Sequence, residues 1–223
     1  MSKKLLISAI VKFMFGILLV GILVFLPAGT LCFGGGILLM SLLFIPMLLV
    51  GVWLFLKSPE LLEKRLDGKE KEATQKGVVA FSGLVFVAGF IVAGLDFRLD
   101  WSTVPTWLTA LAAVLFLSSY GLYAEVMREN TFLSRKIEVQ ENQKVVDTGL
   151  YGVVRHPMYA ATVIMFLMIP LVLGSWFSLL IFLAYPFIIA VRIKGEEKLL
   201  TEQLQGYKEY KQKVKFRLIP FVW

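Results

Sequence analysis

Long runs without a charged residue dominate the first half of the chain. Phe13–Leu56 is uncharged and carries Pro27, Gly29 and the glycines 34–36 near its middle. The run is about twice the ~20 residues that cross a hydrocarbon core, and Pro and Gly mark its turn. We therefore predict two spanning helices joined as a hairpin.

Three further uncharged runs follow. Val78–Leu95 and Val104–Ala124 each have about the length of one span. The last run, Met158–Val191, has Gly174 and Ser175 at its midpoint, so each arm has about 16 residues, or roughly 24 Å of helix. We expect a second hairpin, whose short arms fit either a thinned bilayer or partial insertion.

A different pattern follows the last run. After Glu196, apolar residues recur at helical spacing with lysines between them, which predicts an amphipathic helix whose aromatic rings pack at the membrane surface. These residues, to which we assign no catalysis, are Leu199, Leu200, Leu204, Tyr207, Tyr210 and Val214. The predicted fold class is all-α: a multi-span transmembrane protein with four spanning helices, a C-terminal helical hairpin (158–191) and a cytoplasmic amphipathic helix.

Lys and Arg predict the orientation, because short loops rich in them stay in the cytoplasm. With the N-terminus inside, all of them except Lys12 and Arg98 lie at the N-terminus or in the cytoplasmic segments 57–77, 125–156 and 192–223. The N-terminal lysines and the apolar run also fit a signal peptide, but no small-residue cleavage site follows, so we expect an anchor. Segment 57–77 mixes charges of both signs, which is typical of a solvated connector.

Composition limits the function classes. Hydrophobic residues make up 58% of the 223 residues and charged ones 17%, which is typical of a membrane protein. A single cysteine, Cys32, and a single histidine, His156, exclude a disulfide framework and a multi-histidine metal centre. The net charge of +7 is spread between apolar runs, so the expected partner is the lipid bilayer, with no nucleic acid and no metal.

Several familiar motifs are absent from the sequence. It contains no glycine-rich dinucleotide motif, no phosphate-binding loop and no Gly-x-Ser-x-Gly nucleophile turn. The uncharged runs also lack the carboxylates that mark ion and proton pathways. Soluble nucleotide-binding folds are thus disfavoured, and a transporter is the weaker hypothesis.

A dense polar segment precedes the last uncharged run. Residues 147–149 read Asp-Thr-Gly, which is typical of a turn, and Pro157 suits the first position of a helix. Arg155 and His156 then stand at the mouth of that helix, and Tyr159 follows at headgroup level. Taken singly, these residues also fit snorkelling and aromatic-belt positions.

The far end of the same hairpin carries a second polar pair. Arg192 and Glu196 are four residues apart and share a helix face. Their order, Arg before Glu, is the less favourable one for helix stability, so support of the helix explains the pair poorly. Because a hairpin returns to its starting side, we expect the pair to face Arg155, His156 and Tyr159 and to form a polar pocket at the lipid edge.

These two clusters carry a family resemblance. Residues from about 140 to 210 resemble the isoprenylcysteine carboxyl methyltransferase family of integral-membrane methyltransferases, which is related to the phospholipid methyltransferases. The matching motifs are Val145-Val146-x-x-Gly149-x-Tyr151, Arg155-His156-Pro157-x-Tyr159, Arg192-x-x-x-Glu196-Glu197, Leu199-Leu200 and Tyr207-x-x-Tyr210.

The resemblance implies that S-adenosylmethionine is the cofactor and that the acceptor is a lipophilic small molecule or a lipidated substrate. It makes residues 1–124 a region of transmembrane helices and 125–223 the cofactor-binding and catalytic region, with Arg192 and Glu196 as catalytic residues. The implied cofactor-binding residues are Gln140, Gln143, Lys144, Val145, Val146, Tyr151, His156, Pro157, Met158, Tyr159 and Glu196. Gln143 stands where the family often has histidine, and Ala161 where it often has glycine.

The residue types suit methyl transfer, which mainly requires donor and acceptor to be held in line. A carboxylate and aromatic faces, here Glu196, Tyr151 and Tyr159, suit a positively charged sulfur. Arg192 suits a carboxylate acceptor, which needs no base. An amine acceptor needs a base, with Glu196 as the candidate and His156 behind it. The alternatives are therefore a phospholipid amine N-methyltransferase and a non-enzymatic membrane transporter or scaffold.

Overall fold

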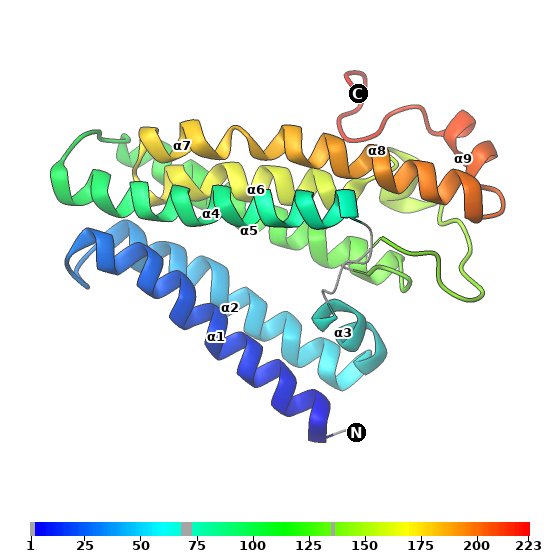
Figure 1. Ribbon diagram of the computed structural model, residues 1–223, viewed down its shortest axis with the longest axis horizontal. Coiled ribbons are helices and arrows are strands. Elements are labelled where there is room, and N and C mark those ends of the chain that lie inside the picture. Colours follow the sequence, from blue (N-terminus) through cyan, green and yellow to red (C-terminus); the bar gives the residue numbers. More distant parts are fainter. Residues whose placement is uncertain (1–2, 68–72, 135–136) are drawn as a thin grey trace.

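The computed structural model describes residues 3–67, 73–134 and 137–223, and it confirms the all-α fold class (Figure 1). Helices and connecting loops account for these described ranges, which contain no β strand. The elements are α1 (Lys3–Ala28), α2 (Gly34–Lys57), α3 (Pro59–Leu66), α4 (Ala73–Leu99), α5 (Thr106–Glu129), the 3-10 helix η1 (Gly149–Gly152), α6 (Pro157–Leu173), α7 (Trp176–Phe182), α8 (Tyr185–Gln203) and α9 (Tyr207–Lys213).

The helices make the chain an integral multi-pass membrane protein. Within the described ranges, five segments are long and apolar enough to cross a bilayer: α1, α2, most of α4, α5, and the segment Trp176–Gln203 formed by α7 and α8. Helix α6 has 17 residues, or roughly 26 Å, and is shorter than a usual span. The second arm of the predicted hairpin is thus the longer one, and it extends far enough to carry Arg192 and Glu196 beyond the apolar run.

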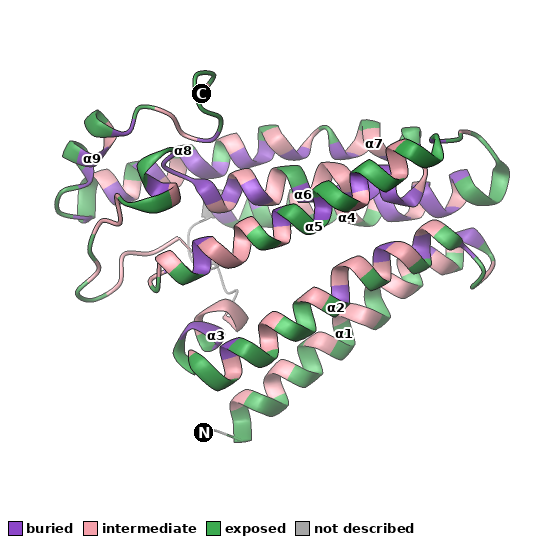
Figure 2. Cartoon of the chain, turned by 180° about the vertical axis from the view of Figure 1, so that it is seen from behind, coloured by how far each residue is buried: buried purple, intermediate pink, exposed green. Residues whose placement is uncertain are grey.

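Helices α4 to α8 form one bundle, and the α1–α2 hairpin meets it mainly at one end (Figure 1). Burial follows this arrangement, because the buried positions concentrate in α4 to α8, while the residues of α1 and α2 are nearly all exposed or intermediate (Figure 2). Phe116, Phe182 and Ile169 lie at the centre of the bundle and are almost fully buried. Exposed apolar side chains on α1 and α2, such as Phe15 and Leu18, suit contact with lipid rather than water.

The turn between α1 and α2 brings the hairpin against the bundle. Gly29 ends α1 with a φ of +70°, a left-handed conformation that glycine adopts without strain. A Cβ on Gly35 would lie 2.8 Å from the carbonyl oxygen of Leu173, so only glycine allows this approach of α2 to the end of α6. The glycine-rich break therefore both turns the chain and docks it.

Beside this contact, the turn between α6 and α7 is held by a buried polar cluster. Gly174 adopts a φ of +81°, and Ser175 caps α7 by accepting a hydrogen bond from the backbone of Ser178. The Ser175 hydroxyl donates to Asp96, whose carboxylate also accepts from the backbone N–H and hydroxyl of Ser102, both at 2.7 Å. Helix α4 extends past the predicted Leu95, and this extension places a buried carboxylate in the bundle.

Segment 57–77 is more than the solvated connector that its charges predicted. Its described part contains α3, where Leu61 and Leu62 are buried against the end of α5. It also contains the first turn of α4, where Gln75 is fully buried. The prediction was wrong because two adjacent leucines and one polar anchor are too few to produce a periodic pattern. Residues 68–72 lie outside the described residues.

The predicted amphipathic helix is divided in two. Helix α8 ends at Gln203, Gly206 adopts a φ of +84°, and α9 begins at Tyr207. Tyr207 and Tyr210 are buried against Leu200, Leu204 and Val145 instead of lying at the membrane surface as expected. The left-handed glycine turns α9 back toward the protein, and a search for helical spacing alone does not register such a break.

Candidate active site

The site begins at the turn before α6. Gly149 opens η1 with a φ of +54°, and the carboxylate of Glu129 accepts the backbone N–H of Leu150 at 3.0 Å. The chain then reaches Pro157, which begins α6 as predicted and has His156 as the preceding cap residue. The loop is thus fixed at both ends before it enters the bundle.

The segment after α9 packs onto this loop through the backbone. The N–H groups of Arg155 and His156 donate to the carbonyl oxygens of Phe216 and Arg217, both at 2.9 Å. The Arg155 guanidinium also donates to the Val214 carbonyl at 2.6 Å. These bonds hold the end of the described chain against the mouth of α6.

Glu197 lies at the centre of a buried ionic cluster beneath the loop. Its carboxylate accepts from Arg155 at 2.7 Å and from Arg217 at 2.9 Å, and one oxygen lies 3.3 Å from Nε2 of His156. Three separate segments of the chain meet on this one carboxylate, which is 4% exposed. Arg155 and His156 therefore contact Glu197, the next residue along α8, while they border the same cavity as Arg192 and Glu196.

Arg192 and Glu196 instead meet through one tyrosine. The Tyr159 hydroxyl donates to Oε2 of Glu196 at 2.6 Å and accepts from Nε of Arg192 at 3.0 Å. A residue of α6 thus joins the two polar residues of α8, as the hairpin argument requires. The Tyr159 hydroxyl therefore makes one hydrogen bond to a positively charged group, Arg192, and one to a carboxylate, Glu196.

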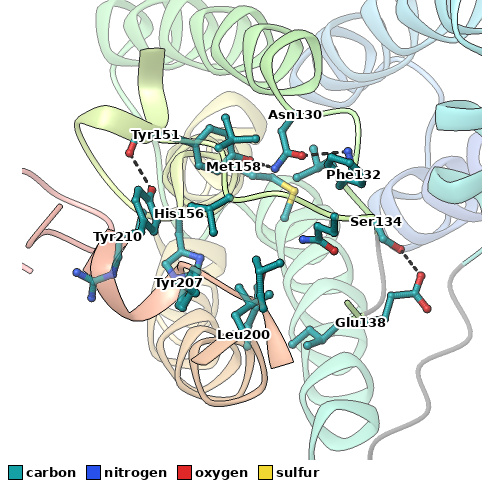
Figure 3. A pocket seen from close by; sticks show the side chains of 18 of the residues that line it. Asn130, Phe132, Ser134, Glu138, Tyr151, His156, Met158, Leu200, Tyr207 and Tyr210 are labelled. Atoms are coloured by element: carbon teal, nitrogen blue, oxygen red, sulfur yellow. Dashed lines mark hydrogen bonds between the residues drawn. The ribbon is translucent and has the colours of Figure 1, made fainter. Parts of the chain in front are cut away.

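These residues border a cavity that encloses about 820 Å³ of space, including the part open to solvent (Figure 3). Its walls come from residues 130–134 and 137–146, η1 and the residues after it, the start of α6, the second half of α8, and α9. It is lined by Asn130, Phe132, Leu133, Ser134, Ile137, Glu138, Gln143, Lys144, Val145, Val146, Tyr151, Arg155, His156, Met158, Tyr159, Arg192, Glu196, Leu200, Leu204, Tyr207 and Tyr210.

Most residues that the sequence nominated border this one cavity. They are Gln143, Lys144, Val145, Val146, Tyr151, His156, Met158, Tyr159, Arg192 and Glu196. Gln140 and Pro157 are not among the lining residues. The Gln140 amide donates to the carbonyl oxygen of Phe132 at 2.6 Å, and Pro157 is buried at the start of α6. Both therefore support the wall behind the lining.

Sequence reasoning missed the contributions of α9 and of the loop after α5. Tyr210 donates to the backbone oxygen of Tyr151 at 2.8 Å, and Asn130 donates to the Tyr151 hydroxyl at 2.9 Å, so both position a lining residue. Tyr207 lines the cavity, and its buried hydroxyl has no hydrogen-bond partner among the described residues. Burial and then the nearby negative charge of Glu197 raise the pKa of Tyr207, so its hydroxyl keeps its proton. The Tyr207-x-x-Tyr210 spacing was the available signal.

Helix α3 also reaches the cavity wall. The Arg65 guanidinium donates to the carbonyl oxygen of Ser134 at 3.3 Å and lies 3.8 Å from the sulfur of Met158. It also lies over the ring of Tyr123, 5.3 Å from the centroid. Segment 57–77 therefore supports the cavity from outside the regions that the sequence nominated.

Two comparisons with known proteins bear on this site. The sequence model of the phospholipid methyltransferase family matches residues 106–207, which is a little under half of the chain. The match begins with α5 and ends at Tyr207, so it contains all the lining residues except Tyr210. The part of the chain that forms the cavity is thus similar to a family of membrane methyltransferases.

A curated relative is the uncharacterized protein YpbQ of Bacillus subtilis (strain 168). It is 28% identical over 98 residues, which are 44% of this chain and 58% of that protein. The chain therefore matches little more than half the length of this relative. The relative's name gives no activity, so the family match carries the functional argument.

Proposed function

We propose that the protein is an S-adenosylmethionine-dependent methyltransferase of the membrane that acts on a lipophilic acceptor. The observation that carries this proposal is the Arg192–Tyr159–Glu196 contact at the wall of the cavity, within a region similar to the phospholipid methyltransferases. Residues 125–223 would then be the catalytic region. The basic residues around it favour a cytoplasmic site and a cytoplasmic N-terminus.

The described residues fit the proposed cofactor. Tyr207 lines the cavity and has a buried hydroxyl without a partner among the described residues, and such a group favours a polar ligand, because an unpaired buried hydroxyl is costly. Glu196 supplies a carboxylate, and Tyr151 and Tyr159 supply aromatic rings. A cation is attracted to both kinds of group. These residues, with the lining backbone of 143–146, would hold the cofactor.

The chemistry then needs little acid–base machinery. When bound, S-adenosylmethionine supplies a methyl group whose bond to a positively charged sulfur breaks as an acceptor atom bonds to the methyl carbon, the electron pair staying on sulfur. Tyr159 orients Glu196 and Arg192 because its one hydroxyl bonds both. Tyr159 and Arg192 are buried, and Glu196 is partly exposed at the wall of the cavity. Alignment of this kind contributes several kcal/mol to a displacement.

A carboxylate acceptor is our first choice, because the Arg192 guanidinium suits it and no proton has to leave. The family match favours a second candidate, since phospholipid methylation is named in its description. An amine acceptor must lose a proton to a base. Glu196 would be that base, because the ring of His156 lies against Glu197. The rate with an amine should fall as the base becomes protonated, and the rate with a carboxylate should change less.

The first test is binding of S-adenosylmethionine to the detergent-purified protein, followed by incubation of membranes with the methyl-labelled cofactor. We expect saturable binding and label in a lipid fraction. Absence of binding at millimolar cofactor would overturn the proposal. The labelled fraction then identifies the acceptor as a carboxylate ester or a methylated amine.

Two neighbouring carboxylates provide a matched test of the site. Glu196→Gln should abolish turnover and leave the melting temperature close to that of the wild type, because Glu196 faces the cavity. Glu197→Gln should lower the melting temperature, since Glu197 pairs with Arg155 and Arg217 in a buried cluster. A scaffold protein has no turnover, so absence of methyl transfer by the wild type would favour that alternative class, while full turnover by Glu196→Gln would contradict the role proposed for Glu196.

The roles within the site can be separated as well. Arg192→Ala should abolish turnover while the Kd of S-adenosylmethionine stays within a few fold. Tyr159→Ala and His156→Ala should weaken cofactor binding by about 1 to 3 kcal/mol. Calorimetric titration of the three variants measures this difference. An equal loss of cofactor affinity in Arg192→Ala would contradict an acceptor-binding role for that residue.

A further inference from the structure

Gln75 is a buried polar side chain that the proposed function does not use. It lies in the first turn of α4, outside the region matched by the family model, and it is fully buried. Its amide oxygen accepts from Nη1 of Arg192 at 3.3 Å. Its amide nitrogen, with two N–H donors, has no hydrogen-bond partner among the described residues.

The surroundings of Gln75 show that the chain makes room for this amide. Gly195 lies on α8 between Arg192 and Glu196, and a Cβ at that position would overlap the Gln75 amide nitrogen. Glycine inside a helix costs about 1 kcal/mol relative to alanine. Glycine at position 195 allows the Gln75 amide of α4 to lie against α8 next to Arg192.

The orientation of the amide is fixed by its neighbour. A guanidinium only donates hydrogen bonds, so the amide oxygen has to face Arg192 and the nitrogen has to face away from it. Turning the amide over would place two donors against each other. The unpaired N–H groups beside Arg192 are therefore a property of the fold, and an acceptor atom is what they lack.

We propose that Gln75 is an acceptor-binding residue, whose amide N–H groups donate to an anionic oxygen of the methyl acceptor that Arg192 also binds. This inference rests on the proposed function and deepens it, because it selects the class of acceptor. Two kinds of donor, from α4 and from α8, suit a carboxylate and repel a protonated amine. The acceptor would then contact both α4 and α8 at the end of the bundle, next to the cavity.

The test uses two substitutions of opposite chemistry and two probes. Gln75→Glu keeps the shape and keeps an oxygen for Arg192 but removes the donors, and Gln75→Met removes both polar atoms. Binding of oleate and of oleylamine is measured on the full chain in detergent, with the Kd of S-adenosylmethionine and the melting temperature measured beside it. Gln212→Glu, at an exposed glutamine of α9, controls for the added negative charge.

We expect Gln75→Glu to bind oleate roughly 10- to 100-fold more weakly than the wild type, in line with the loss of a hydrogen bond to a charged group. Gln75→Met should show a similar loss, and its melting temperature is recorded beside the affinity because the change removes the unpaired N–H groups and also the oxygen that accepts from Arg192. Gln212→Glu should bind oleate like the wild type, and the Kd of S-adenosylmethionine should stay within about twofold throughout.

The opposite pattern would overturn the inference. If Gln75 only supports Arg192, Gln75→Met loses melting temperature but not oleate affinity. This variant decides the question, because a carboxylate at position 75 pairs with Arg192 and weakens oleate binding in either case. Preference of the wild type for oleylamine, or no binding of oleate, rejects the anionic acceptor. Failure of the proposed function is a separate result, because the wild type would then not bind S-adenosylmethionine at all.

Discussion

The two ends of α4 carry buried polar side chains in contrasting states. Gln75 and Asp96 are 21 residues apart, or about 31 Å along the helix, and both are almost fully buried. The Asp96 carboxylate accepts hydrogen bonds from Ser102 and Ser175, which hold the turn between α6 and α7. The Gln75 amide has only its oxygen paired, next to Arg192.

Hydrogen-bond pairing distinguishes buried polar groups that stabilise the fold from buried polar groups that are available to bind a ligand. Satisfied clusters in an apolar bundle fix one arrangement of helices, because any alternative leaves donors unpaired. At the Gln75 end, the Tyr207 hydroxyl is a second buried donor without a partner among the described residues, and Tyr207 lines the cavity. Two such groups at one end of the bundle, beside the region similar to methyltransferases, favour a binding site over a packing defect.

The largest effect should come from breaking the satisfied end. Asp96→Ala leaves the donors of Ser102 and Ser175 without an acceptor, and we expect a loss of about 3 kcal/mol in the free energy of unfolding. Thermal unfolding in detergent measures this loss, with Glu202→Ala as an exposed control on α8. The Kd of S-adenosylmethionine for the folded variant should match the wild type. A variant with normal stability but weak cofactor binding would contradict the comparison.

A smaller effect should come from the unsatisfied end. Tyr207→Phe removes a buried hydroxyl that has no partner, so the ligand-free protein should be as stable as the wild type or more stable. Binding of S-adenosylmethionine should weaken by about 1 kcal/mol, because the hydroxyl then lacks its proposed ligand contact. Unfolding curves with and without the cofactor measure both quantities.

Tyr210→Phe is the matched control for this pair. Its hydroxyl donates to the backbone oxygen of Tyr151, so its removal should destabilise the ligand-free protein by about 1 kcal/mol. If Tyr207→Phe were the destabilising variant and Tyr210→Phe the neutral one, the distinction between satisfied and unsatisfied hydroxyls would be wrong.

The sequence could predict those parts of the structure that depend on local patterns. Uncharged runs and glycine breaks located the apolar helices, since both follow from hydrophobic length and local backbone conformation. The Arg192 and Glu196 pair and Tyr159 were found because a hairpin returns the chain to its starting side. Such arguments concern residues close in sequence or joined by a single turn.

What the sequence did not predict depends on long-range packing. Gln75 meets Arg192 across 117 positions, and Arg65 meets Met158 across 93. Neither residue belongs to a periodic or family pattern. Arg155 and His156 contact Glu197, the neighbour of Glu196. The rotation of α8 about its axis decides which of these two adjacent residues faces inward. That rotation is set by α4 and by the chain after α9, which no local pattern describes.

The smallest effect should come from an exposed ion pair that belongs to neither class. Asp147, in the loop before η1, accepts from Lys213 of α9 at 2.6 Å, and both side chains are largely exposed. The hydrogen bond and the positive charge of Lys213 lower the pKa of Asp147 below its ordinary value of about 3.9. Any stabilisation by the pair is therefore present above that ordinary pKa and is lost as the pH falls through the lowered one.

Because exposed pairs contribute little and salt screens them, Asp147→Asn should have the same melting temperature as the wild type at neutral pH in moderate salt. A small difference should emerge only at low ionic strength and vanish in strong acid, and unfolding curves across both ranges measure it. A large, salt-independent loss in Asp147→Asn would mean that this contact holds α9 against the loop, and it would then have to be counted with the satisfied polar groups that fix the fold.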